Sequence, residues 1–357
     1  MSRAWRGCEE WSDVKAAVYY GVRDIRVEEQ PVPAIEGDDI LLEVEACAIC
    51  GTDVRTFLNG SSTVTPPRVL GHEVCGIVRE ISAGMNDGPR VGDRVIVAPA
   101  VGCGYCRDCQ SGAPNMCERL RTLGLDCDGG FAEYMVVPAR ARFNLIKVPE
   151  GLAPEHATLA EPLACCINGQ DQVGIRLGDS VVVIGAGPIG CMHTLLARLR
   201  GALKVVVIDK VRDRLGVAKE LGATEVLCSE SDEPVSSVLE ITGGAGADVV
   251  IVACPSSEAQ GQALQMCARR GRVLLFGGLP PGKTASLDTN LIHYKQIHVT
   301  GSHASTVLQN RLSVQLLASR VIPSEKLLTR VEPLDRIREA FDAAVSATEM
   351  KIAVKLH

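Results

Sequence analysis

The chain has 357 residues, of which 46% are hydrophobic and 22% charged, and its formal net charge is −6. This length suits about two domains, each able to bury a core, and the mildly negative charge without a basic block argues against nucleic acid or an anionic membrane as a partner. Every apolar run is broken by charge, glycine or proline well before the roughly 20 residues that span a bilayer.

The fifteen cysteines lie in a long chain with full-sized apolar runs. This setting favours reduced thiols and a cytoplasmic location over the disulfide framework of a small secreted domain. Residues 1–13 lack the apolar core of a signal peptide, so we expect a short extension before the fold begins near Val14.

From Lys15 to about Val148, short segments of β type alternate with turn signals. They cover residues 16–20, 40–45, 76–80, 94–97 and 134–137. Such spacing predicts an antiparallel, barrel-like β domain.

Three short motifs in and after this region carry metal-binding side chains. They are Cys50-Gly-Thr52-Asp53, Gly71-His72-Glu73 and Glu161-Pro162. A thiolate, an imidazole and one or two carboxylates gathered in space would bind zinc and leave room for water or substrate. Taken singly, each residue has a plainer interpretation: His72 as a buried, hydrogen-bonded histidine, Cys50 as core packing and Glu161 as a helix cap or solvated face.

A second cluster consists of four cysteines in one short loop. These are Cys103, Cys106, Cys109 and Cys117. Four thiolates are what a closed tetrahedral zinc site requires, and such a site would order a loop with little core of its own. The alternatives are an iron–sulfur cluster, a redox-active thiol cluster and a zinc ribbon that binds nucleic acid, but the loop has too few arginines for a phosphate-binding face.

From about Ala164 to Gly301, strand-like and helix-like segments alternate. The strands are expected at residues 181–184, 205–208, 225–228, 249–253, 273–276 and 298–300. This alternation predicts a parallel sheet covered by helices. Residues 307–357 contain two helix-like stretches and a final strand, 351–356, which we expect to return to the first domain.

The first of these units contains the motif Gly185-Ala-Gly187-Pro188-Ile189-Gly190 directly after a run of β-branched residues. The glycines suit a tight turn, a close approach of backbone to a pyrophosphate, and close packing of helix on strand. Asp209 ends the next strand, where its carboxylate would accept hydrogen bonds from an adenosine ribose and repel a 2′-phosphate. This favours NAD over NADP, although Lys210, Arg212 and Arg214 lie nearby; a glycine-rich turn without nucleotide is the alternative.

At these residues the chain resembles the zinc-dependent medium-chain dehydrogenases. The matching pieces are the three metal motifs, Gly92-Asp93-Arg94-Val95, the four-cysteine loop and the glycine motif with Asp209. The resemblance implies a GroES-like β-barrel catalytic domain, residues 14–163 and 303–357, and a Rossmann NAD-binding domain with a doubly wound parallel sheet, residues 164–302. Glu161, where many alcohol dehydrogenases have cysteine, points to the branch of sorbitol (iditol) and related polyol dehydrogenases.

The resemblance also implies roles for individual residues. Cys50, His72 and Glu73 would hold a catalytic zinc, Glu161 would bind the metal or its water, and the four-cysteine loop would hold a structural zinc. Thr52 would relay the hydroxyl proton, and Asp53 would hold the free ring nitrogen of His72. The remaining cofactor contacts would be Ile189, Asp209 and Arg214 around the pyrophosphate and adenosine, and Phe276, Gly277, Ser302 and His303 nearer the nicotinamide.

The expected reaction is hydride transfer from a secondary alcohol, polyol or cyclitol-like, to NAD, giving a ketone. The alternatives are an amino-alcohol dehydrogenase of threonine type and a non-catalytic NAD-binding redox sensor. Arg55 stands where relatives often end the proton relay with histidine, so that exit for the proton is missing here. Thr56 and Ala304-Ser305 stand where polyol enzymes offer Tyr and an Arg-Tyr pair, which weakens the polyol assignment. A homodimer or homotetramer is expected, since an edge strand near residues 296–300 can pair with its symmetry mate.

Overall fold

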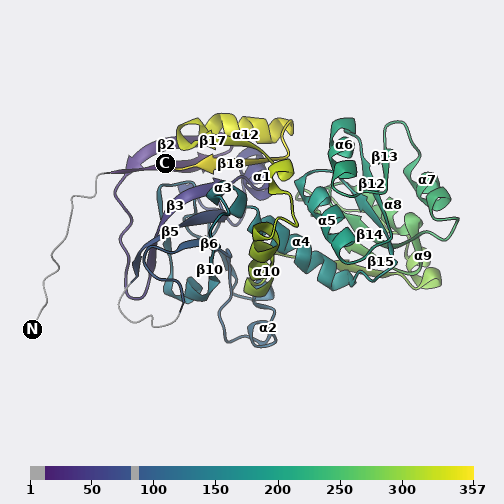
Figure 1. Cartoon of the computed structure of the whole chain (residues 1–357), viewed down its shortest axis with the longest axis horizontal. Helices are drawn as coiled ribbons and strands as arrows, with labels where there is room; N and C mark the ends of the chain where they lie inside the picture. The colour runs from purple at the N-terminus through teal and green to yellow at the C-terminus, as the bar shows by residue number, and fades with distance from the viewer. Residues whose placement is uncertain (1–12, 82–87) are drawn as a thin grey trace, which may run out of the picture. The chain divides into compact units, whose positions relative to one another are not determined.

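The computed structural model describes residues 13–81 and 88–357 (Figure 1). The chain forms two compact units: one contains the described residues up to Glu161 together with Thr306–His357, and the other contains Pro162–Ser305. The expected N-terminal extension, apart from Asp13, lies outside the described residues. Among the helices of the described ranges, none is long and apolar enough to cross a bilayer.

The first unit is built on β-strands. Its strands are β1 (Val14–Gly21), β2 (Asp24–Gln30), β3 (Ile40–Ala48), β4 (Arg68–Val69), β5 (Glu73–Ile81), β6 (Arg94–Val97), β7 (Ala100–Val101), β8 (Arg121–Thr122), β9 (Tyr134–Val137), β10 (Leu145–Lys147), β17 (Leu328–Pro333) and β18 (Lys351–Lys355). The larger sheet has the order β10-β6-β5-β3-β18-β17, with β9 also paired to β3; a second sheet has the order β2-β1-β4, and β7 pairs with β8. All these pairings are antiparallel except that of β17 with β18, so the predicted antiparallel β domain is confirmed.

The end of the chain completes the sheet of the first unit. Strand β18 pairs with β3, and Ala353 lies opposite Ala48. Figure 1 shows the yellow C-terminal strands β17 and β18 beside the purple strand β3. Most of β18 is buried, and its residues Ile352 and Val354 belong to the hydrophobic core of this unit. This confirms the expected return of the final strand.

Short helices connect and cover these strands. They are α1 (Gly51–Asn59), α2 (Arg107–Gln110), α3 (Pro154–Ala157), the start of α4 (Ala160–Val173), α10 (Val307–Ala318), α11 (Ser324–Leu327) and α12 (Ile337–Ser346). Phe57 of α1, Phe131 and Phe341 of α12 are fully buried. The ring centroid of Phe341 lies 5.0 Å from that of Phe57 and 5.8 Å from that of Phe131, so α12 closes the core over α1.

The second unit is a six-stranded parallel sheet with its connecting helices (teal to green in Figure 1). Its elements are β11 (Ser180–Ile184), α5 (Pro188–Leu199), β12 (Lys204–Asp209), α6 (Arg212–Glu220), β13 (Glu225–Cys228), α7 (Pro234–Ile241), β14 (Ala247–Val252), α8 (Ser257–Met266), β15 (Cys267–Leu275), α9 (Thr289–Lys295) and β16 (His298–Gly301). The strand order is β13-β12-β11-β14-β15-β16. The chain adds β12 and β13 on one side of β11 and then crosses over to add β14, β15 and β16 on the other side. This is the doubly wound order of dinucleotide-binding folds, so the predicted Rossmann-type sheet is confirmed.

Candidate functional site

Three side chains of types that can ligate a metal come together in the first unit, where β3, α1 and β5 meet. Cys50 is the residue that precedes α1, and His72 and Glu73 lie at the start of β5. Their ligand atoms all lie within 4.8 Å of one another. The pairing of Ala48 with Glu73 across β3 and β5 places Cys50, two residues further along the chain, beside the His-Glu pair.

Asp53 fixes this arrangement through two contacts. One of its oxygens accepts a hydrogen bond of 2.9 Å from the backbone N–H of Cys50, which caps the first turn of α1. The other lies 3.4 Å from Nδ1 of His72, a separation longer than a well-formed hydrogen bond, and both side chains are buried. Burial opposes protonation of His72, but the charges of Asp53 and Cys50 outweigh it and raise the pKa of the imidazole. The pocket thus favours positive charge at this ring.

Glu73 is held by a lysine from the last strand. Nζ of Lys351 lies 2.6 Å from one carboxylate oxygen of Glu73, and the side chains are 6% and 0% exposed. Burial, together with the nearby charge of Glu161, raises the pKa of the Glu73 carboxyl to about 7 against the opposing effect of Lys351. The other oxygen of Glu73, Oε2, is buried and has no hydrogen-bond partner, so a lone pair remains available to a cation.

Glu161 is buried in the first turn of α4. Its carboxylate is not part of the group whose ligand atoms lie within 4.8 Å of one another. Its charge nevertheless acts on both Glu73 and Lys351. Glu161 therefore lies near Cys50, His72 and Glu73 but is not one of the three residues whose ligand atoms lie within 4.8 Å of one another.

Thr52 has a partner that the family pattern does not contain. Nη2 of Arg55 donates a hydrogen bond of 3.1 Å to the hydroxyl oxygen of Thr52. Because an arginine cannot accept a proton in a protein, this contact orients the hydroxyl but gives a proton no exit through Arg55. The hydroxyl hydrogen of Thr52 stays free to point elsewhere.

The donor set fits a zinc ion. It combines a thiolate sulfur, an imidazole nitrogen and a carboxylate oxygen, which is a mixture found in zinc sites with an open position. The unpartnered Oε2 of Glu73 supports the fit, because a buried polar atom without a partner is costly unless something binds it. The contact of His72 Nδ1 with Asp53 leaves the other ring nitrogen to face a metal.

The four-cysteine loop forms a second cluster in the same unit. Cys103, Cys106, Cys109 and Cys117 place their sulfurs within 4.8 Å of one another. Backbone N–H groups point at the sulfurs, among them Cys103 N to Cys117 Sγ at 3.2 Å and Cys106 N to Cys103 Sγ at 3.4 Å. Short turns, helix α2 and a 3₁₀ turn at Pro114–Met116 bring the four residues to one point.

These N–H groups favour thiolates. Hydrogen bonds from the backbone of Tyr105 and Cys106 lower the pKa of the Cys103 thiol to about 6, whereas burial raises the pKa of Cys109 to about 11. Arg119 adds a guanidinium 3.5 Å from the sulfur of Cys103. A closed, sulfur-only set with partly ionised thiols fits zinc without an open position.

The glycine motif of the second unit lies between β11 and α5. Gly185 has φ +108°, a conformation that favours glycine, and a Cβ on Gly190 would overlap the carbonyl oxygen of Gly185. A Cβ on Gly187 would meet only Nη1 of Arg214, at 3.9 Å. Thus Gly185 and Gly190 serve the turn and its packing, whereas Gly187 leaves space at the start of α5, where unpaired N–H groups suit a phosphate. Pro188 and Ile189 open that helix.

Asp209 lies beside this turn at the end of β12. Its two oxygens accept hydrogen bonds from the backbone N–H groups of Ala186, at 2.6 Å, and Val211, at 2.8 Å. Each carboxylate oxygen can accept more than one bond, so the acid is fixed in position and can still receive hydroxyl donors. Arg214 lies in α6, and its Nη1 is 3.9 Å from the place that a Cβ on Gly187 would take.

The other expected cofactor residues lie after the last two strands of the sheet. Phe276 and Gly277 follow β15, and a Cβ on Gly277 would press on the backbone of Cys254 at 2.6 Å. Ser302 and His303 follow β16, where the side-chain amide of Asn168 donates to the Ser302 hydroxyl and to the His303 carbonyl, each at 3.3 Å. All four therefore lie at the carboxyl edge of the sheet, where open α/β folds bind ligands.

Lys351 is the site residue that the sequence did not reveal. It begins an apolar strand 278 positions after Glu73, and no local motif marks it. The only available signal was a lysine at the head of a strand that is otherwise buried.

Comparison with known proteins agrees with this geometry. Residues 36–150 match the family model "Alcohol dehydrogenase GroES-like domain" and residues 188–319 match "Zinc-binding dehydrogenase". The chain is 34% identical over 350 residues to L-threonine 3-dehydrogenase of Pyrococcus furiosus, covering 96% of this chain and 97% of that protein. It is 33% identical over 349 residues to sorbitol dehydrogenase of Bombyx mori, covering 95% and 97%.

A solved structure shows the same likeness over the whole fold. A protein of Sinorhizobium meliloti 1021, described as a zinc-binding dehydrogenase and crystallised with NADP, superposes with a TM-score of 0.89 at 34% identity. The match covers 96% of this chain and 99% of that one.

Proposed function

The chain belongs to the zinc-dependent medium-chain dehydrogenases, and from this membership we propose that it oxidises a secondary alcohol, polyol or cyclitol-like, to a ketone with NAD. It is an oxidoreductase that uses zinc and a nicotinamide dinucleotide, as the family does. The observation that carries the proposal is the convergence of Cys50, His72 and Glu73 within 4.8 Å. The expected structural zinc belongs to the four-cysteine loop.

The chemistry proposed for the cluster is that of an open metal site. Zinc held by Cys50, His72 and Glu73 supplies a Lewis acid that polarises the substrate oxygen and lowers the pKa of its hydroxyl. NAD, held at the glycine turn, would supply the acceptor for the hydride of the carbinol carbon, and the hydroxyl proton of the alcohol would be released in addition. The protein must take up that proton.

We propose Thr52 as the first group of the relay that accepts this proton. Its hydroxyl can accept one proton while it gives up another, and Arg55 fixes its oxygen from one side. From Thr52 the proton would pass toward the bound cofactor or water, since Arg55 cannot accept it. Asp53 and Lys351 act as positioning residues: the first orients His72, and the second balances the charge of Glu73.

Glu161 is proposed to bind a water molecule rather than the metal itself. It is buried and acts electrostatically on Glu73, yet it lies outside the tight group of ligand atoms. A carboxylate in this position can accept a hydrogen bond from a water at the open coordination position. Substrate would displace or join that water.

NAD is the proposed form of the cofactor. Asp209 is held beside the glycine turn by two backbone donors, and its negative charge suits a ribose diol and opposes a 2′-phosphate. Arg214, next to Gly187, is proposed to contact the pyrophosphate. Ile189, Phe276, Gly277, Ser302 and His303 are proposed to complete the cofactor site.

The test combines metal analysis with activity on the same sample. Purified protein should contain one zinc at each cluster and reduce NAD with at least one member of a polyol and cyclitol panel. Cys50→Ala should lose one zinc and all turnover but keep NAD binding, while Cys127→Ala, a cysteine of the same unit outside both clusters, should keep both metals and activity. Full activity in Cys50→Ala would refute the metal assignment.

An amino-alcohol substrate of threonine type is the second candidate. It is favoured by the 34% identity to an L-threonine 3-dehydrogenase over nearly the whole chain and by Thr56, which stands in place of a polyol-binding tyrosine. Comparing kcat/KM for L-threonine with that for sorbitol separates the two. A higher value for L-threonine would replace the polyol proposal but leave the metal chemistry intact.

We also propose that the protein is a homodimer or homotetramer. Strand β16 is an edge of the parallel sheet, and an edge strand exposes backbone groups that a second copy can pair. Light scattering coupled to size-exclusion chromatography would test this, and a monomer would contradict it.

A further inference from the structure

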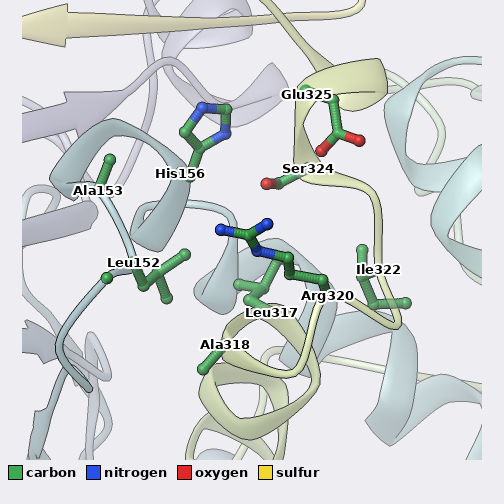
Figure 2. A pocket seen from close by; sticks show the side chains of 10 residues that line it. Leu152, Ala153, His156, Leu317, Ala318, Arg320, Ile322, Ser324 and Glu325 are labelled. Atoms are coloured by element: carbon green, nitrogen blue, oxygen red, sulfur yellow. The ribbon is translucent and has the colours of Figure 1, made fainter.

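A cavity of about 250 Å³ lies in the first unit between the segment 151–156 and the segment 317–325 (Figure 2). None of its lining residues belongs to either metal cluster or to the glycine turn. Elsewhere in this unit, the hydroxyl of Ser313 in α10 donates a 2.6 Å hydrogen bond to the carbonyl of Ala160, so the helix that precedes residues 319–325 is tied to the start of α4. The cavity is therefore a separate feature of this unit.

Arg320 projects its guanidinium into this cavity (Figure 2). The residue follows the C-terminus of α10 and has φ +58°, a left-handed conformation in which helices commonly end with glycine. Its backbone N–H donates to the carbonyl of Leu317, as such a helix end requires. Within the described residues Arg320 makes no ion pair. An arginine therefore occupies a position suited to glycine and directs an unpaired charge into a cavity, and such strain marks candidate functional positions.

A negatively charged residue, Glu325, also borders the cavity. Glu325 and Ser324, at the start of α11, both line it, and Figure 2 shows the Ser324 side chain directed toward the space between His156 and Arg320, with Glu325 farther from His156. Glu325 makes no ion pair with Arg320 or with any other described residue. Two opposite charges thus border one cavity without neutralising each other.

The rest of the lining is apolar, with one polar atom that lacks a partner. Leu152, Leu317 and Ile322 are 8%, 2% and 1% exposed. Nδ1 of His156 is buried and has no hydrogen-bond partner.

We propose that this cavity is a second ligand site, distinct from the catalytic one, that binds an α-amino acid with an apolar side chain. Arg320 receives the carboxylate in a bidentate pair, with Ser324 as a further donor. Glu325 receives the ammonium group, and the side chain lies on Leu152, Leu317 and Ile322. Glu325 disfavours phosphates and dianions, because a second negative charge would face it.

The test uses L-leucine, 4-methylpentanoate, which lacks the ammonium group, and inorganic phosphate as probes of the full-length zinc-loaded protein. Isothermal titration should show that L-leucine binds and that the other two bind at least roughly tenfold more weakly, as expected for the loss of a charge-assisted contact. L-leucine has no hydroxyl to oxidise, so its binding is independent of turnover. No binding of L-leucine at millimolar concentration, or equal binding of 4-methylpentanoate or phosphate, would overturn the proposal.

Two variants separate the ligand role of Arg320 from a structural one. Arg320→Gly should weaken L-leucine binding at least roughly tenfold and leave the Tm unchanged or higher, because glycine suits the backbone there. Glu325→Gln should weaken L-leucine but not 4-methylpentanoate. The control is Arg23→Gly, at an arginine with the same φ of +58° in the turn between β1 and β2, which should bind as the unaltered protein does. Unchanged binding in Arg320→Gly, or a Tm that falls in this variant but not in Arg23→Gly, would contradict the assignment.

Discussion

Nζ of Lys351 and Oε1 of Glu73 lie 2.6 Å apart, and both side chains are buried. This pair connects the last strand of the chain to the proposed metal site. Removing one member of such a pair leaves an uncompensated buried charge, so its consequences extend to both stability and metal binding.

We expect Lys351→Met to lower the free energy of unfolding by about 3–5 kcal/mol and to weaken zinc binding at the Cys50 cluster, because Glu73 then takes up a proton in place of its partner. Urea unfolding of metal-free protein and zinc titration measure the two effects. Lys355→Met is the control, since Lys355 lies at the exposed end of the same strand. Equal effects of the two substitutions would contradict the role given to the buried pair.

Two glycines of one turn should respond differently to the same change. Gly190→Ala places a methyl group on the carbonyl of Gly185 and should destabilise the protein by about 3 kcal/mol or more. Gly187→Ala meets only Arg214, at 3.9 Å, so it should fold normally yet bind NAD more weakly, because the added methyl lies where the pyrophosphate is proposed. Thermal unfolding and NAD titration separate these outcomes, with Gly216→Ala, at an open position in α6, as control.

The four-cysteine loop should depend on zinc for its order. Cys106→Ser should remove one zinc per chain and lower the Tm by more than the roughly 2–4 °C that a loss of about 1 kcal/mol produces in a domain of this size. Metal analysis and calorimetry test this, with Cys127→Ser as the matched control. If zinc content and Tm were unchanged in Cys106→Ser, the loop would not be a metal site.

His193 supplies a pH dependence that is separate from the metal clusters. The residue is fully buried in α5 beside Phe276, and burial, with a smaller effect of Arg200, lowers the pKa of its imidazole from 6.5 to about 3. Below pH 6.5 His193 therefore binds a proton in the unfolded chain but not in the folded chain. The contribution of neutral His193 to the free energy of unfolding is complete above pH 6.5 and is lost as the pH falls toward 3. Between about pH 6 and 4 the loss should approach 1.4 kcal/mol per pH unit.

The measurement compares urea unfolding of the protein and of His193→Gln at pH 7, 5.5 and 4.5. The difference between the two curves isolates the histidine, because both share every other titrating group. A difference that does not change with pH would show that the imidazole titrates normally.

The sequence predicted the elements whose residues carry their own signal. The bounds of β6, β9 and β13 agree with the predicted segments, and β18 joins the sheet expected for it. Strand β2 was missed because Asp24–Gln30 is largely charged and has few apolar residues to alternate, although Ile25 is buried in the core. Strand β17 was missed because Pro333 ends it and its apolar residues do not alternate clearly.

The site was predictable only where short motifs mark it. The motifs around Cys50 and His72 indicated which residues would meet, whereas the partner of Glu73 depends on a strand pairing that no local pattern encodes. The contact between Arg55 and Thr52 also escaped prediction, because nothing in the sequence shows which way a surface arginine turns. The roles of these residues in binding zinc, substrate and NAD stay predictions.

The position of β18 in the middle of its sheet affects how the protein matures on the ribosome. Every strand of the six-stranded sheet emerges before residue 302, so that sheet can form early. Strand β3 pairs with β5 and β9, but it must wait for residues 351–355 before it gains β18, and Glu73 must wait for its lysine. A nascent chain that stalls before residue 351 would carry the six-stranded parallel sheet but not the lysine that pairs with Glu73.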